Sequence, residues 1–389
     1  MTTTQRGIIT LLKSAVTGQS LSLPEDFDLE TAYPPVRKHH MDALLYEGAV
    51  LCGIPREKPI MQQLLRSYCR CLIISEGQLS EIRRIYDAFD RKGIDYLPLK
   101  GVNMKPRYPK PELRSMGDAD ILIRLEQRPQ IDAVLQELGF AFQKETDHEI
   151  IWRTNKLFLE LHKHLIPSYN KDLHPYFGTG WQLARHRSLG CHAMCPEDEF
   201  LFHFTHFTKH YRDGGIGCRY VADLWVFLRT FPDMDLKQVE RELEKLQLLE
   251  FYRNIRCLMD YWFADGPGSE KLDYITDFIF SSGSWGQMES KTLSRAVRDT
   301  KHSLLGFSGR LLYLWQIAFP PAHVLRDKYK VLYKAPWLLP VVWLLRPFYK
   351  LLFEFSSLKK QERNLEALTK ENLSDRRRML QYVGLDYRF

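Results

Sequence analysis

The sequence lacks any apolar run long enough to cross a bilayer as a helix. Its longest uncharged apolar stretch covers residues 335–345, whereas a spanning helix needs about 20 apolar residues. The apolar run near the N-terminus is too short for the apolar core of a secretory signal. We therefore expect no transmembrane segment and a cytoplasmic location.

A regular cysteine framework is also absent. The chain has 7 cysteines, an odd number without a repeating spacing, which favours reduced thiols over a set of disulfides. Cys191 and Cys195 flank a histidine, but no second ligand pair lies at zinc-finger spacing. We favour no metal there, and we find no internal repeat.

Charge is unevenly distributed along the chain. Residues 291–389 contain 19 Lys and Arg against 8 Asp and Glu, a net of +11, so residues 1–290 sum to −4 within the overall +7. A phosphate-rich partner such as RNA, or an anionic membrane surface, would favour such a basic region. A solvated basic face is an equally good interpretation.

Apolar periodicity divides the chain into three parts. Residues 1–92 carry apolar stripes at helical spacing, interrupted by prolines. After residue 93 the pattern changes to strand, loop, strand, helix and three further strands. From residue 196 it is helical again, ending in a charged tail. We predict an α+β fold with a helical N-terminal region (1–92), a mixed-sheet module (93–195) and a helical C-terminal region (196–389). The expected strands cover residues 94–99, 119–124, 139–144, 149–153 and 157–165, with a helix at 128–138.

Two acidic residues, Asp118 and Asp120, lie two positions apart at the start of the second expected strand. Side chains at that spacing point to one face, so both carboxylates can hold the hard cations that also bind phosphates. Glu160, an isolated acid among apolar residues on a later strand, fits as a third ligand; its alternative is a solvent-facing edge position. Two other Asp-x-Asp pairs, beginning at Asp26 and Asp233, lie near prolines and are better explained as turns or helix caps.

Three stretches carry a resemblance to a known family: residues 97–101 (Leu-Pro-Leu-Lys-Gly), 108–109 (Tyr-Pro) and 113–123 (Leu-Arg-Ser-Met-Gly-Asp-Ala-Asp-Ile-Leu-Ile). They resemble the DNA polymerase β-type nucleotidyltransferase superfamily, and within it the bacterial branch labelled uncharacterised nucleotidyltransferase. That branch carries a Leu-Lys-Gly strand end, an Arg-x-Met-x-Asp-x-Asp block and an acid-Leu-His strand, which residues 160–162 match. A looser resemblance reaches residues 203–223 and the segment that begins at residue 336.

The resemblance implies a polymerase β-like module that transfers a nucleoside monophosphate from an NTP, such as ATP, to an acceptor hydroxyl, with release of pyrophosphate. Two ions, Mg²⁺ or Mn²⁺, about 3.5–4 Å apart would stabilise the entering and leaving oxygens. Asp118 and Asp120 would bridge both ions, and Glu160 would hold the ion on the nucleophile side and assist its deprotonation. The acceptor would be a small molecule, a sugar, a peptide product or an RNA end.

Phosphate contacts are expected from Lys100, Gly101, Arg114 and Arg219. The superfamily's first motif is often Gly-Ser or Gly-Gly, whereas valine follows Gly101 here. Contact therefore falls to backbone N–H groups, to the Lys100 charge and to Arg114. Arg219 would reach phosphate with Asp223, one turn later, orienting it; an ordinary intrahelical ion pair between the two is the equal alternative.

His203, His206 and His210 recur at a spacing that places them on one helix face. A zinc site is one interpretation, and we favour buried, hydrogen-bonded histidines among phenylalanines. Two functions from other classes remain as alternatives. One is a nucleotide-binding regulatory protein without turnover. The other is a peripheral membrane factor in cell-envelope assembly, which would use the aromatic and basic residues at 336–346.

Overall fold

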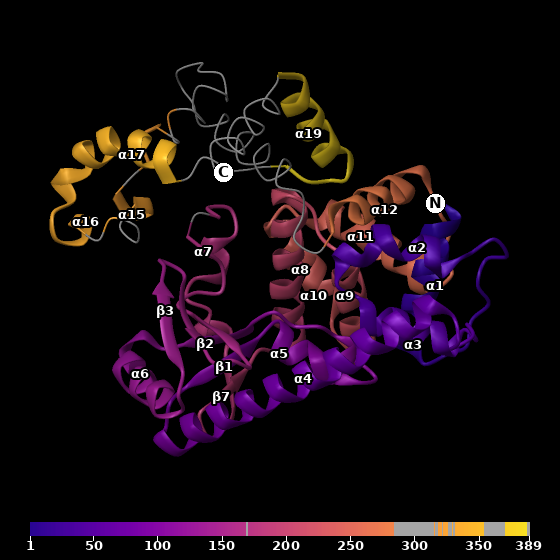
Figure 1. Ribbon diagram of the computed structural model, residues 1–389, viewed down its shortest axis with the longest axis horizontal. Helices are drawn as coiled ribbons and strands as arrows, with labels where there is room; N and C mark the ends of the chain where they lie inside the picture. Colours follow the sequence, from indigo (N-terminus) through magenta and orange to yellow (C-terminus); the bar gives the residue numbers. More distant parts are fainter. Residues whose placement is uncertain are drawn as a thin grey trace. The chain divides into compact units, whose positions relative to one another are not determined.

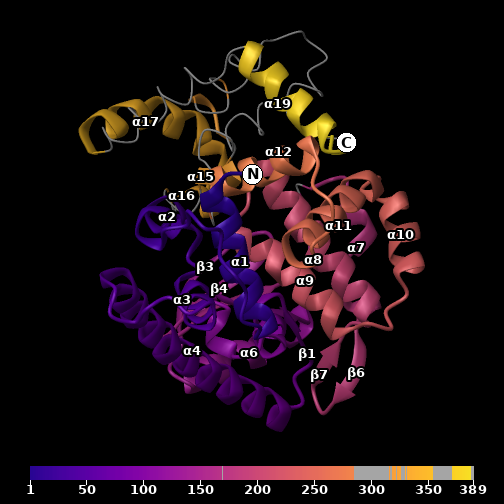
Figure 2. The same ribbon diagram turned by 90° about the vertical axis from the view of Figure 1, so that its right-hand side faces the viewer.

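The computed structural model describes residues 1–168, 170–283, 315, 318–320, 322–325, 329, 331–353 and 370–386. These residues form two compact units. The first holds residues 1–210 and 216–283, and the second holds residues 211–215 and the described residues from 315 onward. Figures 1 and 2 show the chain from two sides. Residues 284–314 and 354–369 of the expected C-terminal region lie outside the described residues.

The first unit contains a seven-stranded mixed sheet with strand order β3-β4-β5-β2-β1-β7-β6. The strands are β1 (Tyr96–Leu99), β2 (Ala119–Ile123), β3 (Ala141–Glu145), β4 (Glu149–Arg153), β5 (Phe158–His162), β6 (Arg185–Ser188) and β7 (Cys191–Ala193). The pairs β2–β5 and β1–β7 are parallel, and the other four pairs are antiparallel. The predicted α+β class is confirmed. Strands β6 and β7 were not expected, because β6 is exposed throughout and β7 is too short to show a period.

Helices make up most of the remaining structure. They are α1 (Thr3–Thr17), α2 (Leu29–Val36), α3 (Asp42–Leu51), α4 (Pro59–Lys92), α5 (Gly101–Met104), α6 (Arg128–Glu137), α7 (His174–Phe177), α8 (Pro196–Asp213), α9 (Cys218–Thr230), α10 (Leu236–Lys245), α11 (Leu249–Phe263) and α12 (Glu270–Ser282). Short 3₁₀ turns are η1 (Arg37–His39), η2 (Lys105–Arg107), η3 (Pro111–Leu113), η4 (Leu125–Gln127) and η5 (Trp181–Leu183). Pro34 and Pro35, expected to interrupt helices, lie inside α2. Neither has an N–H to donate to the residue four positions earlier, and α2 ends one residue after Pro35.

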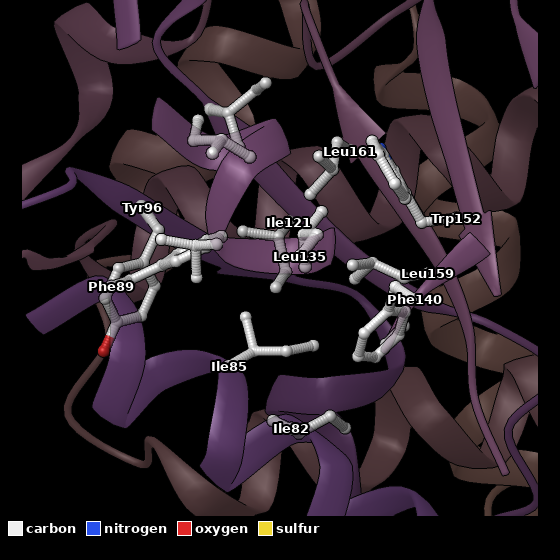
Figure 3. Packing of buried hydrophobic residues seen from close by; sticks show 14 of the residues in the cluster. Ile82, Ile85, Phe89, Tyr96, Ile121, Leu135, Phe140, Trp152, Leu159 and Leu161 are labelled. Atoms are coloured by element: carbon white, nitrogen blue, oxygen red, sulfur yellow. The ribbon is translucent and has the colours of Figure 1, made fainter. Parts of the chain in front are cut away.

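One face of the sheet packs against α4 and α6 (Figures 1 and 3). Ile121 of β2 and Leu159 of β5 meet Ile85 of α4 there, and all three are fully buried. Burial of each such side chain stabilises the fold by about 1.5–3 kcal/mol. Since side chains alternate along a strand, the intervening residues Asp120 and Glu160 point to the opposite face of the sheet.

The N-terminal helices pack against the helices that end the first unit. Gly48 of α3 lies so close to α1 that an added Cβ would stand 2.0 Å from the Leu11 carbonyl oxygen. The N-terminal ammonium of Met1 donates to Asp273 of α12 at 2.8 Å. The predicted division of the chain at residues 92 and 195 stays a prediction.

The second unit contains its own small core. Among its described residues lie α15 (Ala322–Leu325), α16 (Val331–Lys334), the 3₁₀ turn η6 (Pro336–Leu338), α17 (Leu339–Phe353) and α19 (Lys370–Tyr382). Leu325, Leu332 and Val342 are buried together, and the Trp343 indole donates to the Pro320 carbonyl at 2.8 Å. Over the part of the chain that is described, no helix combines the length and apolar character needed to cross a membrane.

Candidate active site

The end of strand β1 brings a cation next to an acid. Leu99 is the register partner of Asp120 on β2, and the Lys100 ammonium lies 2.7 Å from Asp120 Oδ1. The Lys100 backbone has a φ of 45°, a region that disfavours side chains and raises the energy by about 1–3 kcal/mol. Such strain typically occurs where a site needs one particular side-chain position.

Strands β2 and β5 place two of the predicted acids side by side. Asp120 and Glu160 are register partners across this parallel pair. Their oxygens and a ring nitrogen of His162 all lie within 4.8 Å of one another. Asp118, just before β2, lines the same pocket, although within the described residues it is not a member of this close group.

His162 is a site residue that the sequence analysis missed. Its Nε2 lies 2.8 Å from Asp120 Oδ1 and 3.8 Å from Glu160 Oε2. On the other side of the ring, Nδ1 lies 3.0 Å from Nε2 of His148. The strand period contained the signal, because His162 follows Glu160 by two positions and so shares its face.

The electrostatics of the acids are those of a crowded anionic site. Burial raises the pKa of Glu160 to about 8, and the charges of Asp118 and Asp120 add to the rise. Burial and the charge of Asp120 also raise the pKa of Asp118. Burial would do the same to Asp120, but Lys100 and then His162 hold the pKa of that carboxyl well below its usual range. A bound cation would relieve the repulsion among the three carboxylates, so this donor set fits a divalent metal.

A pocket of about 710 Å³ opens over the carboxylates. The opposite wall comes from α8 and from the start of α9. Residues of that wall include His203, His206, Lys209, His210, Arg219 and Tyr220. The volume lies in the range of ordinary small-molecule sites, about 300–1,000 Å³.

Arg114 enters the pocket from a buried ion pair. Its Nε and Nη2 donate to the two carboxylate oxygens of Asp223 at 3.2 and 3.1 Å, and the Tyr108 hydroxyl donates to the same carboxylate at 2.7 Å. The remaining Nη1 is directed at Gly101, where an added Cβ would stand only 2.5 Å from it. Glycine is therefore needed for the guanidinium to lie in this position.

Asp223 is hydrogen-bonded to Arg114, where the sequence analysis expected it to orient Arg219. Burial would raise the pKa of Asp223, and the charges of Arg114 and then Arg219 lower it. Asp223 orients Arg114, because that guanidinium is buried and needs a counter-charge. Arg219 is only half-buried, and its Nη1 donates to the carbonyl and the hydroxyl of Ser115 at 2.8 and 2.6 Å. Both arginines still line the pocket.

Comparison with known proteins identifies the family. Residues 25–264, which include the whole sheet and every residue of the pocket, match the family described as uncharacterised nucleotidyltransferase. The chain belongs to this family. It is therefore a nucleotidyltransferase, as the sequence motifs indicate.

Two further comparisons add little about this nucleotidyltransferase. No curated protein matches the sequence. Among solved structures, it is similar to the solution structure of the antibiotic-resistance factor ANT(2'')-Ia, with 12% identity and a TM-score of 0.34. The similarity covers 49% of this chain and 99% of that one.

The three histidines of α8 share one face in the nucleotidyltransferase, as predicted from their spacing. The favoured interpretation of buried, hydrogen-bonded histidines describes His203 best, since its side chain is 11% exposed and its Nε2 lies 3.6 Å from Glu199. All three are half-buried and line the pocket, with the rings of His206 and His210 4.4 Å apart. Within the described residues, neither of the two groups with metal-ligand spacing contains any of them.

Proposed function

We propose that this nucleotidyltransferase moves a nucleoside monophosphate from an NTP to an acceptor hydroxyl, in a metal-dependent reaction that releases pyrophosphate. The register of β2 and β5 carries the proposal. It sets Asp120 and Glu160 side by side, on the face turned away from the core and toward the pocket. Family membership supports the same chemistry.

Asp118, Asp120 and Glu160 are the proposed holders of Mg²⁺ or Mn²⁺. When bound, such a cation polarises phosphoryl oxygens and offsets the charge that develops on them. The acceptor oxygen attacks the α-phosphorus, and the bond from that phosphorus to pyrophosphate breaks. Glu160, whose pKa is raised by burial and by the neighbouring acids, is the proposed acceptor for the hydroxyl proton.

Lys100, Gly101, Arg114 and Arg219 are the proposed phosphate contacts. Asp223 fixes the Arg114 guanidinium through Nε and Nη2, which leaves its Nη1 edge on the pocket side, beside Gly101. A guanidinium held in this way presents a charge in a fixed direction, so little ordering is needed when an anion binds. Lys100 supplies a second positive charge next to the acids.

The acceptor would lie against the α8 and α9 wall of the pocket. Polar and aromatic side chains on this wall suit a hydroxyl-bearing small molecule, a sugar, a peptide product or an RNA end. Contact with RNA or with a membrane surface stays a prediction from the charge of residues 291–389.

Transfer of label from α-labelled NTPs tests the proposal. The protein is incubated with each NTP, Mg²⁺ or Mn²⁺, and fractionated cell extract, and labelled acceptor and released pyrophosphate are measured. We expect Asp120→Asn to lower transfer at least about 100-fold, as loss of a central active-site group does. Asp26→Asn is the matched control, since Asp26 belongs to another Asp-x-Asp pair and is exposed; it should match wild type.

Two outcomes would contradict the proposal. If Asp120→Asn transfers label as fast as wild type, the carboxylates are not the catalytic group. If the wild type binds NTP with metal but labels no acceptor in any fraction, the regulatory alternative without turnover is favoured instead.

A further inference from the structure

We propose that His162 supplies a nitrogen ligand to the cation held by Asp120 and Glu160, and that the site therefore prefers Mn²⁺ to Mg²⁺. The inference rests on the proposed function, which places a divalent cation at these acids. It extends that function by adding a ligand and by naming the class of metal.

The spacing of the three donors suits one ion. Nε2 of His162 lies 2.8 Å from Asp120 Oδ1 and 3.8 Å from Glu160 Oε2. Around a small divalent cation with bonds of about 2.1 Å, adjacent ligand atoms lie about 3 Å apart. The imidazole is thus already within ligand distance of the same small volume that the two carboxylates face.

The second ring nitrogen of His162 gives it a suitable orientation. A neutral imidazole carries one N–H and one lone pair. For Nε2 to bind a cation, Nδ1 must carry the hydrogen and donate it to Nε2 of His148, which lies 3.0 Å away. The lone pair on Nε2 then faces the acids. Histidines that bind metals nearly always donate their other N–H to a carboxylate, a backbone carbonyl or a water; here the imidazole of His148 takes that place. His162 is also 1% exposed, so its ring has little freedom to turn away.

The protein itself places a cation against this oxygen and nitrogen. The Lys100 ammonium lies 2.7 Å from Asp120 Oδ1 and 3.5 Å from His162 Nε2. Asp120 Oδ1 and His162 Nε2 therefore already face one positive charge, and a metal ion bound between them would displace the ammonium.

A second close group contains His148, Glu149 and His162. Its member His148 already has Nε2 3.0 Å from Nδ1 of His162. It also offers one carboxylate where the first group offers two, so it neutralises a divalent charge less well. The group with Asp120 and Glu160 is therefore the better cation site.

The donor set determines the metal preference. Mg²⁺ binds oxygen ligands and retains water, whereas imidazole nitrogen favours first-row transition ions, and carboxylates suit Mn²⁺ as well. Replacing His162 should leave Mg²⁺ affinity nearly unchanged and weaken Mn²⁺. We expect the ratio of Mn²⁺ to Mg²⁺ affinity to fall by about tenfold or more, since even outer-shell partners of metal ligands change affinity 10–100-fold.

Pulsed electron paramagnetic resonance of Mn²⁺ bound to the full-length chain tests the inference without any turnover. Wild type should show coupling of the metal to ¹⁴N, and growth with ¹⁵N-histidine should replace it with a ¹⁵N coupling. His162→Gln should abolish the coupling, while His206→Gln, a change at another histidine of the same pocket, should keep it. Competition between Mn²⁺ and Mg²⁺ then gives the affinity ratio for each variant.

The results separate this inference from the proposed function. Bound Mn²⁺ without nitrogen coupling, or coupling that persists in His162→Gln, overturns the ligand assignment and leaves the proposed function standing. Failure of the wild type to bind Mn²⁺ or Mg²⁺, even with NTP present, overturns both. The isotope exchange needs no variant: a nitrogen coupling that ¹⁵N-histidine leaves unchanged would exclude every histidine, His162 included. Loss of the coupling in His162→Gln then assigns it to His162 among the histidines.

Discussion

The buried pair of Arg114 and Asp223 gives the most quantitative prediction. Their side chains are 7% and 9% exposed and share two hydrogen bonds. Removing one partner leaves the other charge buried without compensation, which destabilises a protein by about 3–5 kcal/mol. We expect losses of that size in the free energy of unfolding for Arg114→Met and for Asp223→Leu alone.

The double variant should be much closer to wild type. With both charges gone, the main remaining penalty is the Tyr108 hydroxyl, which donates to Asp223 in the native protein. An unsatisfied buried hydroxyl destabilises by about 1–3 kcal/mol. The cost of the double variant should therefore fall at least about 3 kcal/mol short of the sum of the two single costs.

Urea unfolding of all four proteins, followed by circular dichroism, measures these differences. Lys245→Met removes one partner of the exposed pair with Glu242, whose side chains are 66% and 21% exposed. It serves as the control and should change stability by less than about 1 kcal/mol. Single losses below about 1 kcal/mol that add up in the double variant would refute the reasoning, because Arg114 would then not depend on Asp223 for its position.

Three further predictions concern the site and its support. Gly101→Ala adds a Cβ that presses on the Arg114 guanidinium, so calorimetry should show that NTP binding is weakened roughly tenfold. The control is Gly77→Ala, whose added Cβ would have its nearest contact 3.8 Å away; it should leave NTP binding unchanged. Burial would raise the pKa of Glu199, but hydrogen bonding and the charge of Arg107 lower it to about 2 from 4.5. The stability it contributes is therefore present above pH 4.5 and lost as the pH falls toward 2, so wild type and Glu199→Gln should differ at pH 6 and converge near pH 2; a constant gap would contradict this. Lys100→Met removes the charge that offsets the acids. Mg²⁺ or Mn²⁺ should therefore raise the unfolding temperature of this variant, relative to chelator, by more than it raises that of wild type. An equal or smaller shift would argue against a cation at the carboxylates.

The parts of the fold that follow from local sequence were predictable. Short strand-like segments between turn residues located the first four strands, and alternation of apolar and polar residues located the fifth. The two-residue period predicted that Asp118 and Asp120 share one face. The closeness of Asp120 and Glu160 was also predicted, because Glu160 is an isolated acid among apolar residues on a later strand of the same module. Their catalytic roles stay a prediction until transfer is measured.

What escaped prediction depends on contacts between distant residues. The pairing of Arg114 with Asp223 joins residues 109 positions apart, and no local pattern distinguishes it from the intrahelical pair with Arg219. His162 was not predicted as a site residue because histidine has many roles in proteins. The sequence analysis assigned the metal-binding role on this strand to Glu160 alone. The histidines of α8 face a pocket because a second element lies across from them, which helical spacing cannot reveal.

The parallel register of β2 and β5 ties the chemistry of this enzyme to its stability. Sliding β5 by one residue would turn Glu160 into the apolar layer over α4 and expose Leu159 in its place. A sequence change that shifts this pairing therefore removes the acid from the active site and, at the same time, disrupts the hydrophobic core. Insertions inside β5 should therefore be rejected in any working descendant of this chain.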